Sequence, residues 1–161
     1  MKPRIDLMQP VAAGALQAMM GLERHVRQAG FEHGLLDLVR MRASQINGCA
    51  YCLDMHSKDA RANGETEQRL YGLNAWRETP YYSDRERAAL ELTESLTLVA
   101  ERGVPDEVFD RVKQQFSEDE IAHLSLAIVS INGWNRLNVA ARTVPGGYVA
   151  GSVEKAHAGA H

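Results

Sequence analysis

Residues 121–131 constrain the fold more than any other stretch, because they are apolar on nearly every side of a helix. Ser117 and Glu120 precede them with the spacing of a capping box, in which two side chains satisfy free backbone N–H groups, so a helix should begin there. A helix that is apolar all round must be covered by other elements. We therefore predict that this helix, continuing past Gly133 to Arg142, lies at the centre of the domain or in a subunit interface.

The rest of the chain also has helical spacing with start and stop signals, and it lacks the alternating pattern of strands. We predict an all-α fold, with helices over residues 10–29, 34–46 and 49–63 and a short segment over 66–73. Residues 76–82 should form a loop around Pro80. A capping box at Ser83 and Glu86 predicts a long helix to about Arg102, and Pro105 should open a short helix to about Gln115.

The length and composition indicate a single soluble domain. The chain has 161 residues, of which 45% are hydrophobic and 24% are charged, and its formal charge is −3. We expect one domain over residues 1–150 and a loose tail over 151–161. The charge argues against nucleic-acid binding, and no segment has the pattern of a signal peptide or of a membrane span. We therefore expect a cytoplasmic protein without nucleic-acid or membrane partners.

The only two cysteines, Cys49 and Cys52, form a Cys-x-x-Cys motif that is followed by His56. Asn47-Gly48 is typical of a left-handed helix stop, so the motif should begin the next helix. On a helix the three side chains share one face, and an N-terminal position favours thiolate over thiol. In the reducing cytoplasm such a pair would cycle between dithiol and disulfide. Asp37, on the preceding helix, could accept a proton or orient His56.

Other interpretations of these residues remain open. The cysteines could be small buried apolar residues, or they could bind zinc together with His56, although the sequence offers no clear fourth ligand. Asp37 could be a solvated charge on its helix. His123, on the apolar helix, is more simply a hydrogen-bonded core histidine than a catalyst.

Residues 42–58 resemble the core of the alkylhydroperoxidase D-like (AhpD-like) proteins, in the carboxymuconolactone decarboxylase superfamily. The resemblance is strongest from about Leu36 to Gly64, residues 131–138 are similar to the last core helix of that family, and the rest of the chain agrees in helical pattern. It implies a compact multi-helix fold, with the Cys-x-x-Cys motif at a helix N-terminus. It also implies a homo-oligomer, such as a dimer, trimer or hexamer.

The same resemblance implies a catalytic function as a peroxiredoxin-type antioxidant enzyme that reduces hydroperoxides without metal, flavin or haem. By position, Cys52 matches the peroxide-attacking cysteine, Cys49 the cysteine that resolves it, and His56 the histidine of the proton relay. Asp37 stands where the family has a glutamate, and Tyr51 stands where the best-studied peroxidases have a second histidine. The decarboxylase branch does not use this cysteine pair, so its activity is not implied.

The resemblance further implies that an external dithiol, on a thioredoxin-like or lipoyl-bearing protein, reduces the disulfide after each turnover. The same residues would also serve a non-enzymatic redox sensor or partner-binding protein. In that alternative, disulfide formation changes the motif helix, and hence an interface, without efficient turnover.

Overall fold

The computed structural model describes residues 1–7, 9 and 13–152, and within these residues the regular structure is entirely helical, as predicted. The elements are α1 (Ala13–Gln28), α2 (His33–Asn47), α3 (Ala50–Ala62), α4 (Glu67–Gly72), the 3-10 helix η2 (Leu73–Glu78), α5 (Asp84–Thr97), α6 (Val99–Arg102), α7 (Asp106–Lys113) and α8 (Glu118–Ala141). The predicted start of the first helix at Pro10 and most of the predicted tail lie outside the described residues.

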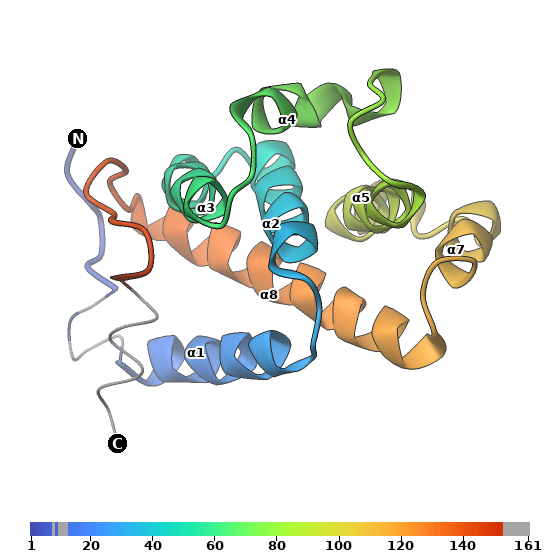
Figure 1. Cartoon of the computed structure of the whole chain (residues 1–161). Helices are drawn as coiled ribbons and strands as arrows, with labels where there is room; N and C mark the ends of the chain where they lie inside the picture. The colour runs from blue at the N-terminus through green and yellow to red at the C-terminus, as the bar shows by residue number, and fades with distance from the viewer. Residues whose placement is uncertain (8, 10–12, 153–161) are drawn as a thin grey trace.

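The apolar helix lies at the centre of the fold. Figure 1 shows α8 crossing the molecule, with α1 on one side and α2 and α3 on the other. Helices α1, α2, α3, α5 and α7 all pack against it. Its buried residues Leu124 and Ile128 join a core with residues of α2, α5 and α7. The chain therefore covers much of α8 by itself, and the apolar character of this helix does not require a second subunit.

The predicted helix boundaries follow from local hydrogen bonds. Both capping boxes are present, at Ser83 with Glu86 and at Ser117 with Glu120. Gly48 ends α2 with a φ of 65°, which is the left-handed conformation that glycine adopts at little cost. The helix from Ser117 continues past Gly133, as predicted, and ends before Arg142.

Two predictions about the middle of the chain are wrong. The helix from Asp84 does not run unbroken to Arg102, because Leu98 leaves the helical conformation and separates α5 from α6. Thr97, the last residue of α5, accepts a hydrogen bond from Asn132 of α8. The sequence around Thr97 does not predict this contact. Trp76 belongs to η2 and not to a loop.

Glu94 connects three elements of the fold. This buried carboxylate accepts hydrogen bonds from Arg42 of α2 at 2.8 Å, from the indole N–H of Trp76 at 2.9 Å and from Arg77 at 2.5 Å. Burial alone would raise the pKa of Glu94, but these donors hold it below its ordinary value. Because Glu94 lies on α5 and its donors lie on α2 and η2, these bonds hold η2 and α2 against α5.

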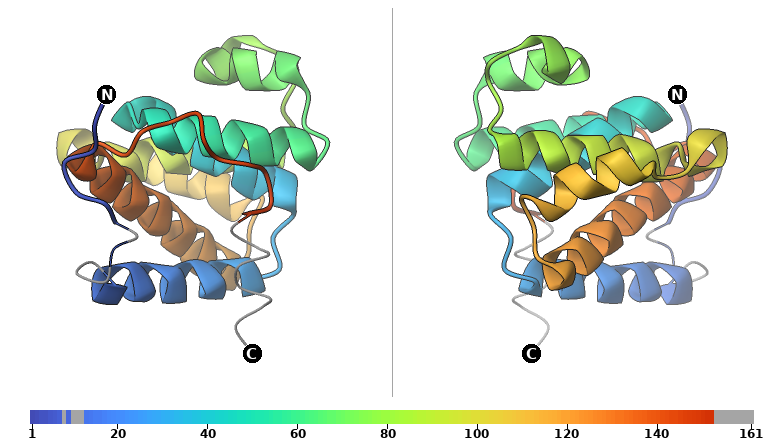
Figure 2. Two further views of the ribbon diagram at one scale, coloured as in Figure 1. Left: turned by 90° about the vertical axis from the view of Figure 1, so that its left-hand side faces the viewer. Right: turned by 90° about the vertical axis from the view of Figure 1, so that its right-hand side faces the viewer.

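The segment after α8 returns along the motif helix. Figure 2 shows it crossing α3. Lys58 donates to the carbonyl oxygens of Gly146 and Tyr148, and Asp54 accepts from the backbone N–H of Gly146. The hydroxyl of Tyr148 donates to Asp59 at 2.8 Å, and the N–H of Gly151 also bonds Asp59. These bonds fix the outer face of α3. No helix among the described residues is long and apolar enough to cross a membrane.

We predict that Leu124→Ala lowers the free energy of unfolding by about 2–5 kcal/mol, because it leaves a cavity where α8 is fully enclosed. Val129→Ala is the matched control on the same helix, because Val129 is 55% exposed, and it should change stability by no more than about 0.5 kcal/mol. Urea unfolding measures both. Equal losses would mean that the face around Val129 is also covered.

Candidate functional site

Cys49 and Cys52 are joined by a disulfide at the N-terminus of α3, with their Cα atoms 5.3 Å apart. Cys49 is the N-cap of the helix, and its backbone N–H bonds the carbonyl oxygen of Ser44 across the Gly48 turn. Both cysteines are buried, at 1% and 2% exposure. The tight connection between α2 and α3 therefore places the disulfide in the interior of the protein.

The two sulfurs accept hydrogen bonds from different parts of the chain. The Cys49 sulfur accepts from the backbone N–H of Cys52 at 3.3 Å, which is the N-cap bond of the helix. The Cys52 sulfur accepts instead from the side chain of Asn138 on α8, at 3.8 Å. The motif's place at a helix N-terminus predicted that free backbone N–H groups would stabilise both sulfurs. In the structure, the backbone N–H bond goes to the Cys49 sulfur, and the donor to the Cys52 sulfur is a side chain.

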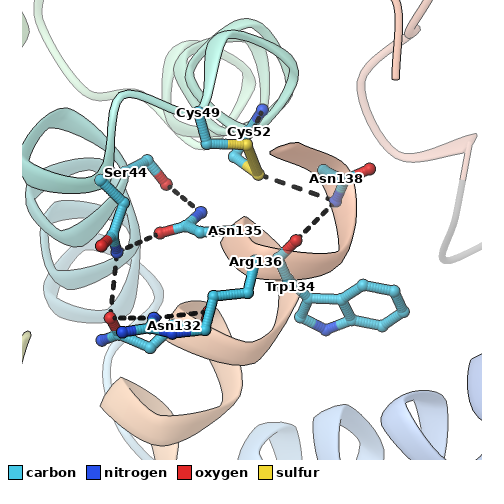
Figure 3. The surroundings of a disulfide bond; sticks show 9 residues. Ser44, Cys49, Cys52, Asn132, Trp134, Asn135, Arg136 and Asn138 are labelled. Carbon is cyan, nitrogen blue, oxygen red and sulfur yellow. Dashed lines mark hydrogen bonds between the residues drawn. A yellow bond between two sulfur atoms is a disulfide. The ribbon is translucent and has the colours of Figure 1, made fainter. Parts of the chain in front are cut away.

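Asn138 reaches the disulfide from the C-terminal half of α8 (Figure 3). Its side-chain nitrogen also donates to the carbonyl oxygen of Trp134 at 2.9 Å. The residue is only 7% exposed. The Trp134 carbonyl can only accept a hydrogen bond, so its partner must be the nitrogen of the Asn138 amide. This fixes the orientation of the amide, and the same nitrogen, not the oxygen, faces the Cys52 sulfur.

A network of further amides joins α2 to α8 beside the disulfide (Figure 3). Asn135 is fully buried and donates to the hydroxyl of Ser44 at 3.0 Å. Asn47 donates to the side-chain oxygens of both Asn135 and Asn132 at 2.9 Å. A cavity of about 240 Å³ opens next to this network, lined by Asn47, Asn135, Arg136, Val139 and Ala140. The network holds the end of α2, and with it the start of the motif, against α8.

His56 follows Cys52 by one helical turn and is partly buried. Burial, together with the positive charges of Arg40 and Arg27, lowers the pKa of His56 to about 3. The imidazole is therefore neutral at neutral pH, so it can accept a proton but supplies no positive charge. Among the described residues, no hydrogen bond or ion pair of His56 fixes its orientation.

Arg40 is held by acidic groups from two helices. Glu23 of α1 accepts from Arg40 at 2.6 Å and from the hydroxyl of Ser130 at 3.1 Å. Arg27 lies 3.6 Å from the same carboxylate. Glu23 thus connects α1 to α2 and α8. It keeps the positive charge that acts on His56 in place.

Asp37 is buried, so it is not the solvated charge that the sequence left open. It accepts a hydrogen bond from Asn63 at 2.9 Å and lies 3.7 Å from Arg40. Asn63 follows the last turn of α3, so this contact is at the opposite end of the helix from the cysteines. Burial raises the pKa of Asp37 in spite of Asn63 and Arg40. The interactions of the described residues include no bond between Asp37 and His56.

The structure also bears on the alternatives for the histidines and cysteines. The two sulfurs bond each other, and in the described part of the chain no three His, Cys, Asp or Glu side chains are grouped to bind a metal. His123 is only partly buried and not a core residue; its ring packs at a tilt against that of His25, with 5.3 Å between ring centroids, and lies 3.8 Å from Asp119. It is remote in sequence from the motif and makes no bond to it among the described residues.

Known proteins are similar to this chain in both sequence and fold. The model of the carboxymuconolactone decarboxylase family matches residues 13–95, which is more than half of the chain. The chain belongs to this family. It is 45% identical over 130 residues to the uncharacterized protein YdfG of Bacillus subtilis, covering 81% of this chain and 88% of that one. The family assignment confirms the resemblance inferred from residues 42–58.

Two crystal structures place this family member among proteins with the AhpD-like fold. A protein of unknown function from Agrobacterium tumefaciens, described as a candidate antioxidant defence protein AhpD, is 40% identical with a TM-score of 0.87. The match covers 91% of this chain and all of that one. The debrominase Bmp8, in complex with 2,3,4-tribromopyrrole, is 21% identical with a TM-score of 0.73, over 81% of this chain and 70% of that one. At that identity the second likeness shows the fold alone.

The residues that the sequence interpretation missed lie on α8. Asn132, Asn135 and Asn138 recur every three residues in the C-terminal half of a mostly apolar helix, so they share one stripe. A buried amide needs hydrogen-bonding partners, and this spacing was a detectable signal that the stripe faces a polar feature. The feature is the disulfide and the end of α2.

We predict that His56 makes the oxidised protein less stable in acid. Between pH 6.5, its ordinary pKa, and about 3, its pKa in the folded protein, the unfolded chain binds more protons than the folded one. The free energy of unfolding should therefore fall as the pH drops through this window. His56→Gln removes this dependence, so the variant should gain stability relative to wild type between pH 7 and pH 4. Urea unfolding at several pH values tests this, and parallel pH profiles would contradict it.

Proposed function

We propose that the protein is a thiol-dependent peroxidase that reduces hydroperoxides through a Cys49–Cys52 dithiol/disulfide cycle. The observation that carries the proposal is the pair itself, with two buried sulfurs bonded at a helix N-terminus and each accepting an N–H hydrogen bond. Donors of this kind stabilise a thiolate, which is the reactive form of cysteine. The similarity to the Agrobacterium protein supports the same chemistry.

The cycle begins with the loss of a proton from Cys52 to the neutral imidazole of His56, whose pKa the neighbouring thiolate raises above its value in the disulfide form. The Cys52 thiolate attacks the O–O bond of the hydroperoxide, so its sulfur becomes a sulfenic acid and the alkoxide leaves as the alcohol after taking a proton. The Cys49 thiol then condenses with the sulfenic acid, and one water is released. The product is the disulfide seen in the structure.

An external dithiol returns the pair to the reduced state. It supplies two electrons and two protons, becomes a disulfide itself, and leaves two thiols on this chain. We propose a thioredoxin-like or lipoyl-bearing protein as this partner. None of these steps needs a metal or an organic cofactor.

The central experiment counts thiols before and after one equivalent of tert-butyl hydroperoxide is added to the reduced protein. Both thiols should disappear, and an excess of a small dithiol should then support many turnovers. Oxidation that occurs once, with no turnover in any reductant, would favour the redox sensor. Release of bromide from a brominated pyrrole without peroxide consumption would instead favour the debrominase chemistry named for the structural neighbour.

We predict that Cys52→Ser abolishes peroxide consumption, because only the attacking sulfur is needed for the first step. Cys49→Ser should leave a sulfenic acid on Cys52 that a chemical probe can trap, because no second thiol resolves it. Mass spectrometry locates the probe. Peroxide consumption by Cys52→Ser, with the label on Cys49, would reverse the two roles.

We predict that His56→Ala slows the reaction of the reduced protein with hydroperoxide most strongly at neutral pH, because the variant lacks the base that takes the thiol proton. The loss should be about 10²-fold or more and should shrink as the pH rises and solvent alone removes the proton. Single-turnover rates against pH measure this. A loss that is constant at all pH values would point to a structural role.

A further inference from the structure

The two sulfurs of the disulfide differ in the source of their hydrogen bonds. The backbone N–H of Cys52 bonds Cys49, so no substitution that keeps the helix removes this donor. Cys52 itself faces the N–H of Asn138, a side chain from another helix. One donor is therefore built into the motif, whereas the other depends on how α8 packs against α3.

The Asn138 amide is held in a fixed orientation. Its nitrogen carries two hydrogens, and the geometry directs one to the carbonyl oxygen of Trp134 and the other to the Cys52 sulfur. Asn135, one helical turn earlier, is locked to Ser44, which fixes the register of α8 against the end of α2. The donor is thus in place before any charge develops on the sulfur, and it requires little reorganisation.

Resting on the proposed peroxidase cycle, we propose that Asn138 is a catalytic residue that stabilises negative charge on the Cys52 sulfur and so selects Cys52, rather than Cys49, as the nucleophile. When the Cys52 thiol loses its proton to His56 or to water, the Asn138 N–H donates to the thiolate. Without Asn138, the remaining direct N–H donor serves Cys49, and the difference between the two thiols shrinks or reverses.

Thiolate absorbance against pH in reduced single-cysteine variants tests this without requiring peroxide activity. Cys49→Ser reports on the Cys52 thiol, and Cys52→Ser reports on the Cys49 thiol. Each is compared with and without Asn138→Leu, which has a similar volume but no donor. Apart from the substituted cysteine, these variants keep every ionisable side chain of the surrounding helices, including Tyr51, Asp54 and His56 on α3, Arg40 on α2 and Arg136 on α8.

We expect Asn138→Leu to reduce the thiolate fraction of Cys52 at neutral pH by about tenfold, as for the loss of a hydrogen bond to a charged group. The Cys49 thiolate should change by less than about twofold. Asn138→Gln keeps the amide and should recover part of the Cys52 thiolate. Asn132→Leu removes an amide of the same network that does not contact a sulfur, so it should leave Cys52 unchanged.

Several outcomes would overturn the proposal. An unchanged Cys52 titration shows that Asn138 does not act on the thiolate, and equal losses at both sulfurs, or an effect of Asn132→Leu of the same size, show a general effect of packing. If Asn138→Leu does not fold, Asn138→Ala provides the same comparison, and circular dichroism checks each variant. A normal Asn138 effect in a protein that consumes no hydroperoxide would instead refute the proposed function and leave the thiolate selection intact.

Discussion

Asn135 is fully buried between α2 and α8, where its amide has to find protein partners because water cannot reach it. Ser44 and Asn47 supply them, and both lie in the last turn of α2. A shift of α8 by one residue would turn Asn135 away from Ser44 and leave these groups unsatisfied, at a cost of about 1–3 kcal/mol for each group. The register of the central helix is thereby tied to the end of α2, and the cysteine motif begins two residues later.

Local chemistry in the sequence is sufficient for most of the helix boundaries. Ser83 and Ser117 each precede a glutamate at the spacing of a capping box, and Gly48 supplies a left-handed stop, so the end of α2 and the starts of α5 and α8 follow from residues within one turn of each boundary. The same logic placed Cys49 at a helix start. It also predicted that α8 lies at the centre of the domain or in a subunit interface, because residues 121–131 are apolar on nearly every side of a helix.

Features that depend on contacts between distant residues could not be predicted in this way. The end of α5 is held by Asn132 of α8, 35 residues away in sequence. Glu23 sits among apolar residues in its helical pattern, and only the structure shows that it pairs with Arg40 of α2. Asp37 was considered as a partner of His56, yet the chain brings Asn63 to it, because antiparallel α2 and α3 place the start of one beside the end of the other. Helical spacing predicts which residues share one face of a helix, but it does not predict which residues of other helices contact that face.

The charges around the cysteines explain why neutral groups suit this site. The nearby cation Arg40 is already engaged by Glu23 and Asp37, and His56 is neutral. A cation dedicated to a buried thiolate would lose its partner each time the disulfide formed, and an unpaired buried charge is costly. An amide N–H, or the N-cap N–H of a helix, carries no net charge and remains hydrogen-bonded to sulfur in the disulfide, as the structure shows. In the proposed cycle, dipolar donors would therefore allow one buried site to hold both the charged and the uncharged form of the pair without rearranging the helices around it.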